Sequence, residues 1–333
     1  IELRKDRLNR CIKMIKEYSD EIIDALQKDF GNRDPKSSFL TEIASTIGVL
    51  EHAIKNVDKW TKDEKRPSNV DRPFFIRMLM GLLGSKSYIK YQPLGTVGVI
   101  SPWNFPVNLI LAPLGGIFAA GNRAMIKPSE LTPATSEVTK KMFEAYFDKS
   151  EAAVFTGDAE VGAAFSALPF DHLLFTGGTQ IGKKVMKAAS DNLVPVTLEL
   201  GGKSPVIVDE DANLSEVAKK VMRGKTMNAG QICLAPDYLM LPKGKSEEFA
   251  KASNEAVSEM FADLKYNEDY TSVINERHYE RINELVSDAK EKGAEVIQIN
   301  PADEDFEQQE LHKIPPTLVL NPTDEMKIMQ EEI

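Results

Sequence analysis

The sequence predicts an α/β fold with a parallel sheet in a first domain and further α/β structure in a second. Short β-rich runs alternate with stretches of helical periodicity from residue 88 onward. Such alternation is typical of a parallel sheet with helices on both faces. The chain also has 333 residues, which is long for one hydrophobic core and suits two domains.

The first sixty residues are predicted to be helical. Apolar residues recur at helical spacing in two stretches, which are separated by Gly31 and Pro35. We interpret them as two antiparallel helices packed on a domain, in preference to a free coiled coil. Residues 63–84 are then expected to form an irregular connector.

The remaining elements follow from the same patterns. The ligand of such a sheet is expected at the carboxyl ends of its strands. The strands of the first α/β stretch are predicted at 88–91, 96–100, 124–127, 152–156, 172–176, 196–200 and 205–208, with helices at 107–120, 133–147, 159–167 and 180–189. The second stretch is predicted to hold helices at 215–227, 247–260 and 276–292, strands at 238–241, 295–299 and 317–320, and an acidic solvated loop at 300–309.

Composition excludes several classes of protein. The net charge of −10 argues against a nucleic-acid partner, which favours a basic face. No apolar run reaches the roughly 20 residues that span a membrane. The only two cysteines, Cys11 and Cys233, exclude a disulfide scaffold and suit a reducing compartment such as the cytoplasm. No signal peptide is visible, and the first and last residues, Ile1 and Ile333, suggest that both ends are cut.

Two glycine-containing segments are near misses to a phosphate-binding loop. Residues 177–183 fit the first seven positions of a Walker loop, but Lys184 stands where a magnesium-binding Ser or Thr belongs. The segment still follows an apolar strand and opens a helix, so its N–H groups suit an anion such as a pyrophosphate; an ordinary glycine turn is an equal alternative. The second segment, residues 197–204, has the Gly-Lys-Ser ending of a Walker loop, but Thr197 stands where the first glycine of that loop belongs.

Cys233 and Glu199 are candidates for covalent and acid–base chemistry. Cys233 follows a glycine in an expected loop, so it is either an inert core residue or a reachable nucleophile. Glu199 lies inside an apolar strand. It is either buried with a raised pKa, as a general base requires, or an ion-paired residue at a strand end. Cys11 is expected to be structural.

A third candidate is Asn104, a polar amide in a turn framed by prolines. Its NH₂ group would suit an oxyanion, or the residue caps the helix that begins near Val107. Lys127 and Glu130 end another strand and by themselves indicate a capped loop. The four histidines lack metal-ligand spacing, so no metal is expected. No G-x-S-x-G motif of a serine hydrolase is present.

Five ordered segments together resemble the aldehyde dehydrogenase superfamily. They are PWNFP (102–106), MIKPSE (125–130), FTGGTQIGKK (175–184), LELGGKSP (198–205) and GQICLAPDY (230–238). The separation of 34 residues between Glu199 and Cys233 is also similar to that family. KPSE and APDY resemble the class 3 and coniferyl aldehyde dehydrogenase branch most.

The resemblance implies how the chain is divided. It implies a Rossmann-like NAD(P)-binding domain over residues 1–200 and a catalytic domain over 201–333 that is incomplete at its C-terminus. Residues 78–93 resemble the start of the family's bridging hairpin, and the closing MQEEI resembles the start of its EE-I-F-G-P segment.

The resemblance also implies a reaction. The thiolate of Cys233 would attack an aldehyde carbon, and the resulting oxyanion would lie between the Asn104 amide and the Cys233 N–H. Hydride transfer to the nicotinamide would convert the thiohemiacetal to a thioester. Glu199 would then activate water and release a carboxylic acid.

The implied cofactor is NAD, with NADP as a second acceptor in many members that carry KPSE. A carboxylate at Glu130 accepts from a ribose 2′-OH and repels a 2′-phosphate. Many relatives carry Ser in place of Gly178, so a side-chain contact to phosphate is lost here. The residues implied to contact the cofactor are Trp103, Lys127, Ser129, Glu130, Gly157, Gly177, Gly178, Leu200 and Glu332.

The substrate is expected to be a coniferyl-type, other aromatic or medium-chain aldehyde. A homodimer or higher homo-oligomer is expected, and membrane contact only through a tail beyond Ile333. One alternative is an acylating enzyme that uses coenzyme A, against which Glu199 argues. Another is a catalytically silent binding or structural relative of the same fold.

Overall fold

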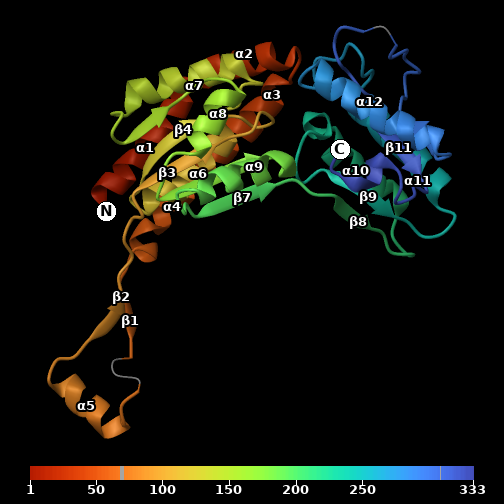
Figure 1. Ribbon diagram of the computed structural model, residues 1–333. Coiled ribbons are helices and arrows are strands. Elements are labelled where there is room, and N and C mark those ends of the chain that lie inside the picture. Colours follow the sequence, from red (N-terminus) through yellow and green to blue (C-terminus); the bar gives the residue numbers. More distant parts are fainter. Residues whose placement is uncertain (68–70, 308) are drawn as a thin grey trace.

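The computed structural model describes residues 1–67, 71–307 and 309–333. Two α/β bodies lie beside each other, and the chain passes between them just after strand β7 (Val196–Leu200) (Figure 1). A narrow arm that carries helix α5 (Phe74–Leu82) projects away from the first body. Within the described residues, no helix combines the length and apolar character needed to cross a bilayer.

The first body contains a five-stranded parallel sheet in the order β5-β4-β3-β6-β7. The chain moves outward from β3 to β5 and then returns to the other side of β3 with β6, which creates a switch point between β3 and β6. This sheet confirms the predicted α/β class. Besides β7, its strands are β3 (Thr96–Ile100), β4 (Arg123–Lys127), β5 (Ala152–Val154) and β6 (His172–Gly177).

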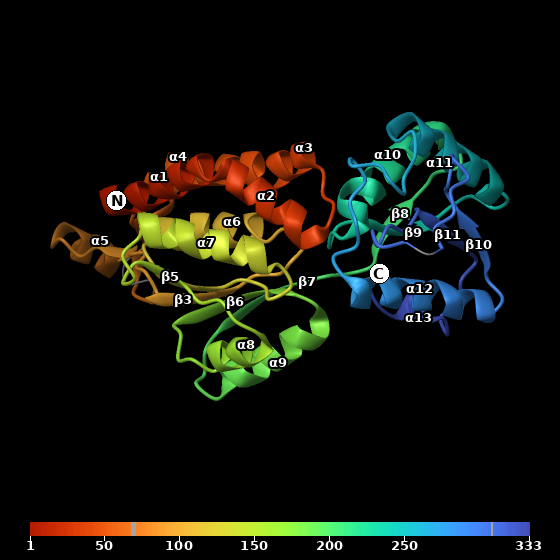
Figure 2. The same cartoon turned by 90° about the horizontal axis from the view of Figure 1, so that it is seen from above.

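Helices cover both faces of this sheet, as the alternating pattern predicts (Figure 2). Helices α6 (Asn108–Ala119) and α7 (Pro133–Tyr146) cover one face, and α8 (Ala159–Ser166) and α9 (Thr179–Ser190) cover the other. Each face has its own cluster of buried apolar side chains. The carboxyl ends of the strands remain free to present loops.

The N-terminal helices form an outer layer over α6 and α7, which confirms that they pack on a domain. The first predicted helix is broken at Tyr18 into two helices that bury different surfaces, one against α4 and α6 and one against α7. The second begins with a π-helical turn. The elements are α1 (Glu2–Glu17), α2 (Ser19–Phe30), α3 (Pro35–Ser38), the π-helical turn Phe39–Ala44 and α4 (Ser45–Trp60).

The second body has a separate core between two small two-stranded sheets and their helices. Strands β8 (Ser204–Ile207) and β9 (Pro236–Met240) are parallel, and β10 (Glu295–Gln298) and β11 (Thr317–Leu320) are antiparallel. The helices are α10 (Leu214–Thr226), α11 (Ser246–Met260), α12 (Glu276–Glu291) and α13 (Lys327–Gln330).

Two expectations about connecting segments need correction. The irregular connector predicted at 63–84, of which residues 68–70 lie outside the described residues, is wrong elsewhere, because β1 (Glu64–Arg66) pairs with β2 (Ser87–Ile89) and α5 lies between them. The hairpin therefore begins well before residue 78. The loop at 300–309, whose residue 308 lies outside the described residues, is only partly solvated. The Glu304 carboxylate accepts two backbone N–H groups, and Phe306 packs against the second core.

A buried ion pair fixes the N-terminal layer to the sheet. Arg33 Nη2 lies 2.9 Å from Glu42 Oε1, and both side chains are almost completely buried. The other carboxylate oxygen of Glu42 accepts the N–H groups of Val107 and Asn108, at the start of α6. Burial raises the pKa of Glu42, but Arg33 and these N–H groups oppose that shift.

We expect Glu42→Ala to lower the free energy of unfolding by about 3–5 kcal/mol, because it leaves the Arg33 charge buried without its partner. Urea denaturation followed by circular dichroism measures this. Asp58→Ala is the matched control, since it breaks the exposed Lys5–Asp58 pair and should leave the midpoint unchanged. Equal midpoints for the two variants would contradict the importance of the buried pair.

Candidate active site

Asn104 follows β3 at the switch point and is bonded to the second body. Its Nδ2 donates to the carbonyl oxygen of Gln231 over 3.0 Å. Its own carbonyl oxygen accepts from Arg33 Nη1 at 2.9 Å and from Asn228 Nδ2 at 3.2 Å. The alternative that Asn104 caps α6 is wrong, because Glu42 accepts the first N–H groups there. Asn104 instead joins the end of β3 to the segment that carries Cys233.

Cys233 lies just after a turn with unusual backbone geometry. Asn228, Ala229 and Gly230 have φ values of 49°, 52° and 75°, and this left-handed region is costly for residues other than glycine. The side chain of Gln231 stabilises this turn through hydrogen bonds. Its Nε2 donates to the carbonyl oxygens of Asn228 and Ser272, at 2.9 and 3.0 Å.

A third side-chain contact of Gln231 completes this support, because its Oε1 accepts the N–H of Ile274 at 3.0 Å. The turn therefore has fixed geometry, and Cys233 emerges from it as an exposed residue. Cys11, in contrast, is fully buried on α1, and burial raises the pKa of its thiol. Of the two cysteines, only Cys233 is reachable by a substrate.

The surroundings of Cys233 disfavour ionisation of its thiol. Partial burial of the sulfur raises the pKa, and the negative charges of Glu332 and Glu199 raise it further. Both carboxylates are thus close enough to Cys233 to affect its charge. Higher pH or a nearby positive charge favours the thiolate, which is the nucleophilic form.

Glu199 lies on β7, an edge strand of the sheet, and its side chain is exposed. The hypothesis that it is a buried carboxylate is therefore wrong for this structure. Successive side chains of a strand point to opposite faces of the sheet, so Thr197 and Glu199 share an exposed face while Val196, Leu198 and Leu200 pack against the core. Its position nevertheless places a carboxylate near Cys233.

Glu332 is half-buried against the segment that follows β7. A Cβ atom on Gly201 would overlap its carboxylate, and the N–H of Gly202 donates to it. Burial and the charge of Asp237 raise the pKa of Glu332. Lys203 keeps this C-terminal segment in place, because Nζ pairs with Asp237 and donates to the carbonyl oxygen of Ile328 at 2.8 Å.

Lys127 and Glu130 form an ion pair just after β4, with 2.8 Å between Nζ and Oε2. Lys127 is buried and Glu130 is exposed. Burial opposes ionisation of Glu130, but the hydrogen bond and charge of Lys127 outweigh it and lower its pKa. Ser129 is buried between them and accepts the N–H of Leu131, so its oxygen already has a local partner.

The remaining predicted positions also lie where strands end. Gly157 follows β5 with a φ of 149°, where a Cβ atom would collide with Val161. A Cβ atom on Gly177, at the end of β6, would collide with the ring of Phe175. Gly178 has ordinary backbone geometry and open space around it, so a serine would fit there. Leu200 ends β7 beside Gly182 of α9.

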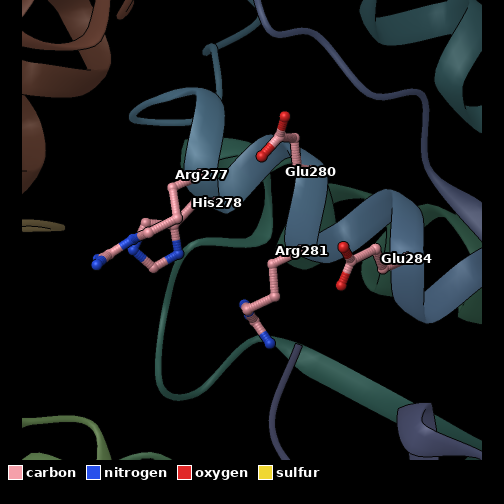
Figure 3. A pocket seen from close by; sticks show the side chains of 5 residues that line it. All are labelled: Arg277, His278, Glu280, Arg281 and Glu284. Carbon is pink, nitrogen blue, oxygen red and sulfur yellow. The ribbon is translucent and has the colours of Figure 1, made fainter.

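Sequence reasoning missed a charged face on α12. A cavity of about 340 Å³ is lined by Arg277, His278, Glu280, Arg281 and Glu284 (Figure 3). Arg281 Nη1 lies 3.2 Å from Glu331 Oε1, so this face is close to the Glu332 segment. The only sequence signal is the spacing of three and four residues that puts Arg277, His278 and Arg281 on one side of a helix.

Trp103 joins this face to the first body. Its ring centroid lies 5.0 Å from that of His278 and 6.3 Å from that of Phe30. Burial and the charges of Arg277 and Arg281 lower the pKa of His278 to about 4, so the imidazole is neutral at physiological pH.

Taken together, the site contains an exposed thiol, a nearby amide, two carboxylates and a row of glycines and polar groups at the ends of parallel strands. Such an arrangement suits covalent chemistry at Cys233 beside an extended ligand with anionic groups.

Comparison with known proteins agrees with this geometry. The whole chain, residues 1–333, matches the aldehyde dehydrogenase family. It is 56% identical over 332 residues to a probable coniferyl aldehyde dehydrogenase of Caulobacter vibrioides and 49% identical over 333 residues to a coniferyl aldehyde dehydrogenase of a Pseudomonas species. Each alignment covers 100% of this chain and 67% of the relative.

A solved structure of the substrate-bound AldH of Staphylococcus aureus matches with a TM-score of 0.88 and 38% identity, over 100% of this chain and 69% of that one. Structures of aldehyde dehydrogenases in complex with NAD⁺, from Mycobacterium tuberculosis and Bacillus cereus, match with TM-scores of 0.83 and 0.82 at 25% identity. The chain therefore belongs to the aldehyde dehydrogenase family and is an aldehyde-oxidising oxidoreductase.

Proposed function

We propose that the protein oxidises coniferyl-type or other aromatic or medium-chain aldehydes to carboxylic acids, with NAD as the electron acceptor. The assignment of the site rests on one observation. Cys233 is exposed after a turn that side-chain hydrogen bonds hold in place, and the Asn104 amide is hydrogen-bonded to that same turn. The substrate class rests on the names of the Caulobacter and Pseudomonas relatives.

The polar groups at the strand ends fit a dinucleotide. The Glu130 carboxylate, held ionised by Lys127, suits ribose hydroxyl groups. Gly178 opens α9 and is exposed, so the N–H groups of this helix terminus suit a pyrophosphate. Glu332 affects Cys233 and lies beside Arg281 of α12, so this region suits a nicotinamide ribose. When bound, NAD supplies an acceptor for the hydride.

In the first half of the reaction, the Cys233 thiolate attacks the aldehyde carbon, and a C–S bond forms as the carbonyl electrons move to oxygen. One N–H of the Asn104 amide already bonds to Gln231, which leaves the second free to donate to this oxyanion together with the Cys233 N–H. Loss of hydride from the carbon then leaves a thioester on Cys233.

In the second half, Glu199 removes a proton from water, and the water oxygen attacks the thioester carbon. The C–S bond breaks, the acid is released and Cys233 is regenerated. The exposed position of Glu199 suits this role, since the side chain reaches solvent and is also close enough to affect Cys233.

We further propose a homodimer in the cytoplasm. The projecting β1–β2 hairpin has unpaired strand edges that suit pairing with another chain. The two cysteines are free, as is usual in a reducing compartment.

Cys233→Ala should abolish acid formation but preserve NAD binding, because only the nucleophile is removed. NADH formation with coniferyl aldehyde, benzaldehyde and hexanal, with and without coenzyme A, measures this in the protein encoded by the complete gene. Cys11→Ala is the control and should leave turnover near that of the unmodified protein. Residual acid formation by Cys233→Ala would refute the nucleophile, and turnover that requires coenzyme A would favour the acylating alternative.

Glu199→Gln should slow steady-state turnover by about 10²–10⁴-fold but keep the initial burst of NADH, because the base acts after hydride transfer. The burst rate is expected to increase with pH as the Cys233 thiol ionises. Glu199→Gln should move this increase to lower pH, since a negative charge that raises the pKa of Cys233 is lost. Stopped-flow absorbance across pH 6–10 records both effects. Glu210→Gln, at an exposed position, should change neither. Loss of the burst would place Glu199 in the first half of the reaction.

Glu130→Gln should raise kcat/KM with NADP relative to NAD by about tenfold or more, because repulsion of a 2′-phosphate is removed and Lys127 loses its carboxylate partner. Initial rates with each cofactor give the ratio. Glu137→Gln, exposed on α7, is the control. An unchanged ratio would mean that Glu130 does not determine the cofactor preference.

A further inference from the structure

The arm, residues 64–91, differs from the rest of the protein in charge. It contains six basic residues and two acidic ones, whereas the chain as a whole has a net charge of −10. The arm extends from the first body and carries α5 at its far end (Figure 1). A basic, projecting element on an acidic protein is suited to an anionic partner.

The tip of the arm is strongly apolar. Helix α5 has no buried residue, and its sequence FFIRMLMGL contains one charged side chain. Phe74 is 77% exposed, and Leu82 and the adjacent Leu83 are each 78% exposed. Large apolar side chains are normally covered in a soluble protein, so a contiguous group of them marks an interaction surface.

The width of this apolar surface indicates what covers it. At about 100° per residue, the exposed apolar side chains spread over roughly 200° of the helix circumference. A helix that docks on one protein surface typically needs an apolar stripe about 100° wide. An arc twice as wide suits immersion in an apolar layer. The exposed residues are Phe74, Phe75, Ile76, Met78, Leu79, Leu82 and Leu83.

Basic side chains lie on both sides of the apolar helix, as they do in helices that bind at a bilayer surface. Arg72 precedes α5 and Lys86 follows it, and both are exposed. Lys90 lies further down the arm, near the exposed aromatic rings of Tyr88 and Tyr91. Apolar side chains would enter the acyl region, while basic and aromatic side chains would remain at the level of the headgroups. Nine residues are too few to span the bilayer, so α5 would lie within one leaflet.

We propose that α5 and its basic flanks dock this protein on an anionic lipid surface. A second copy of the chain is the main competing occupant, because its acidic surface would also attract the arm. One protein surface would, however, cover only part of the apolar arc. Docking would bring the site close to aldehydes that partition into lipid, and it does not depend on the residue roles proposed for the reaction.

The test is co-sedimentation of the protein encoded by the complete gene with sucrose-loaded vesicles. We expect binding to vesicles of phosphatidylcholine and phosphatidylglycerol at 7:3, weaker binding to pure phosphatidylcholine, and loss of this difference in high salt. The double variant Leu82→Ser/Leu83→Ser should bind at least tenfold more weakly. Ile207→Ser is the matched control, since Ile207 is 77% exposed but lies on β8.

Further variants separate the contributions and check the fold. Arg72→Ser/Lys86→Ser should lower binding to the anionic vesicles only, and Phe75→Trp should show a blue-shifted emission when those vesicles are added. Each variant should retain aldehyde oxidation in vesicle-free buffer, because the arm does not touch the site. Absence of vesicle binding by the unmodified protein, or equal binding by the double leucine variant, would overturn the proposal. Conversion of a dimer to a monomer by that variant, without vesicle binding by the unmodified protein, would assign α5 to a second copy.

Discussion

The buried pair of Arg33 and Glu42 is the interaction on which the arrangement of the site depends. Two charges removed from water are tolerated only when each has several partners. Glu42 meets this need by accepting the first N–H groups of α6, and Arg33 by donating to the carbonyl oxygen of Asn104. The loop after β3 is thereby fixed from the side of the N-terminal helices.

The same N-terminal segment also reaches the second body. Asn32 accepts the N–H of Ser272 and donates to the carbonyl oxygen of Tyr270. Gln231 in turn binds the backbone of residues 272 and 274 and supports the turn before Cys233. Residues that are distant in sequence therefore hold the amide and the thiol together at the junction of the two bodies.

Electrostatics at this junction oppose the charge that the reaction needs on sulfur. Glu332 and Glu199 both raise the pKa of Cys233, whereas Arg281 and Lys225 favour ionisation of Glu332. Glu199, the proposed base, is thus exposed and near the nucleophile, and the same proximity makes the Cys233 thiol less acidic. The arm lies apart from these groups, so its contacts with a surface can change without altering the chemistry.

Local periodicity and ordered motifs are enough to predict the parallel α/β fold, the family, and the strand-end positions of Asn104, Lys127 and Gly177. The environment of Glu199 and the role of Arg33 depend on contacts between distant parts of the chain. The apolar stretch 196–200 predicts burial, but other elements cover only one face of β7, and the Glu199 carboxylate lies on the other face. Likewise, the exposure of helix α5 and the position of the charged face of α12 beside the Glu332 segment are properties of the folded molecule, which no local pattern encodes.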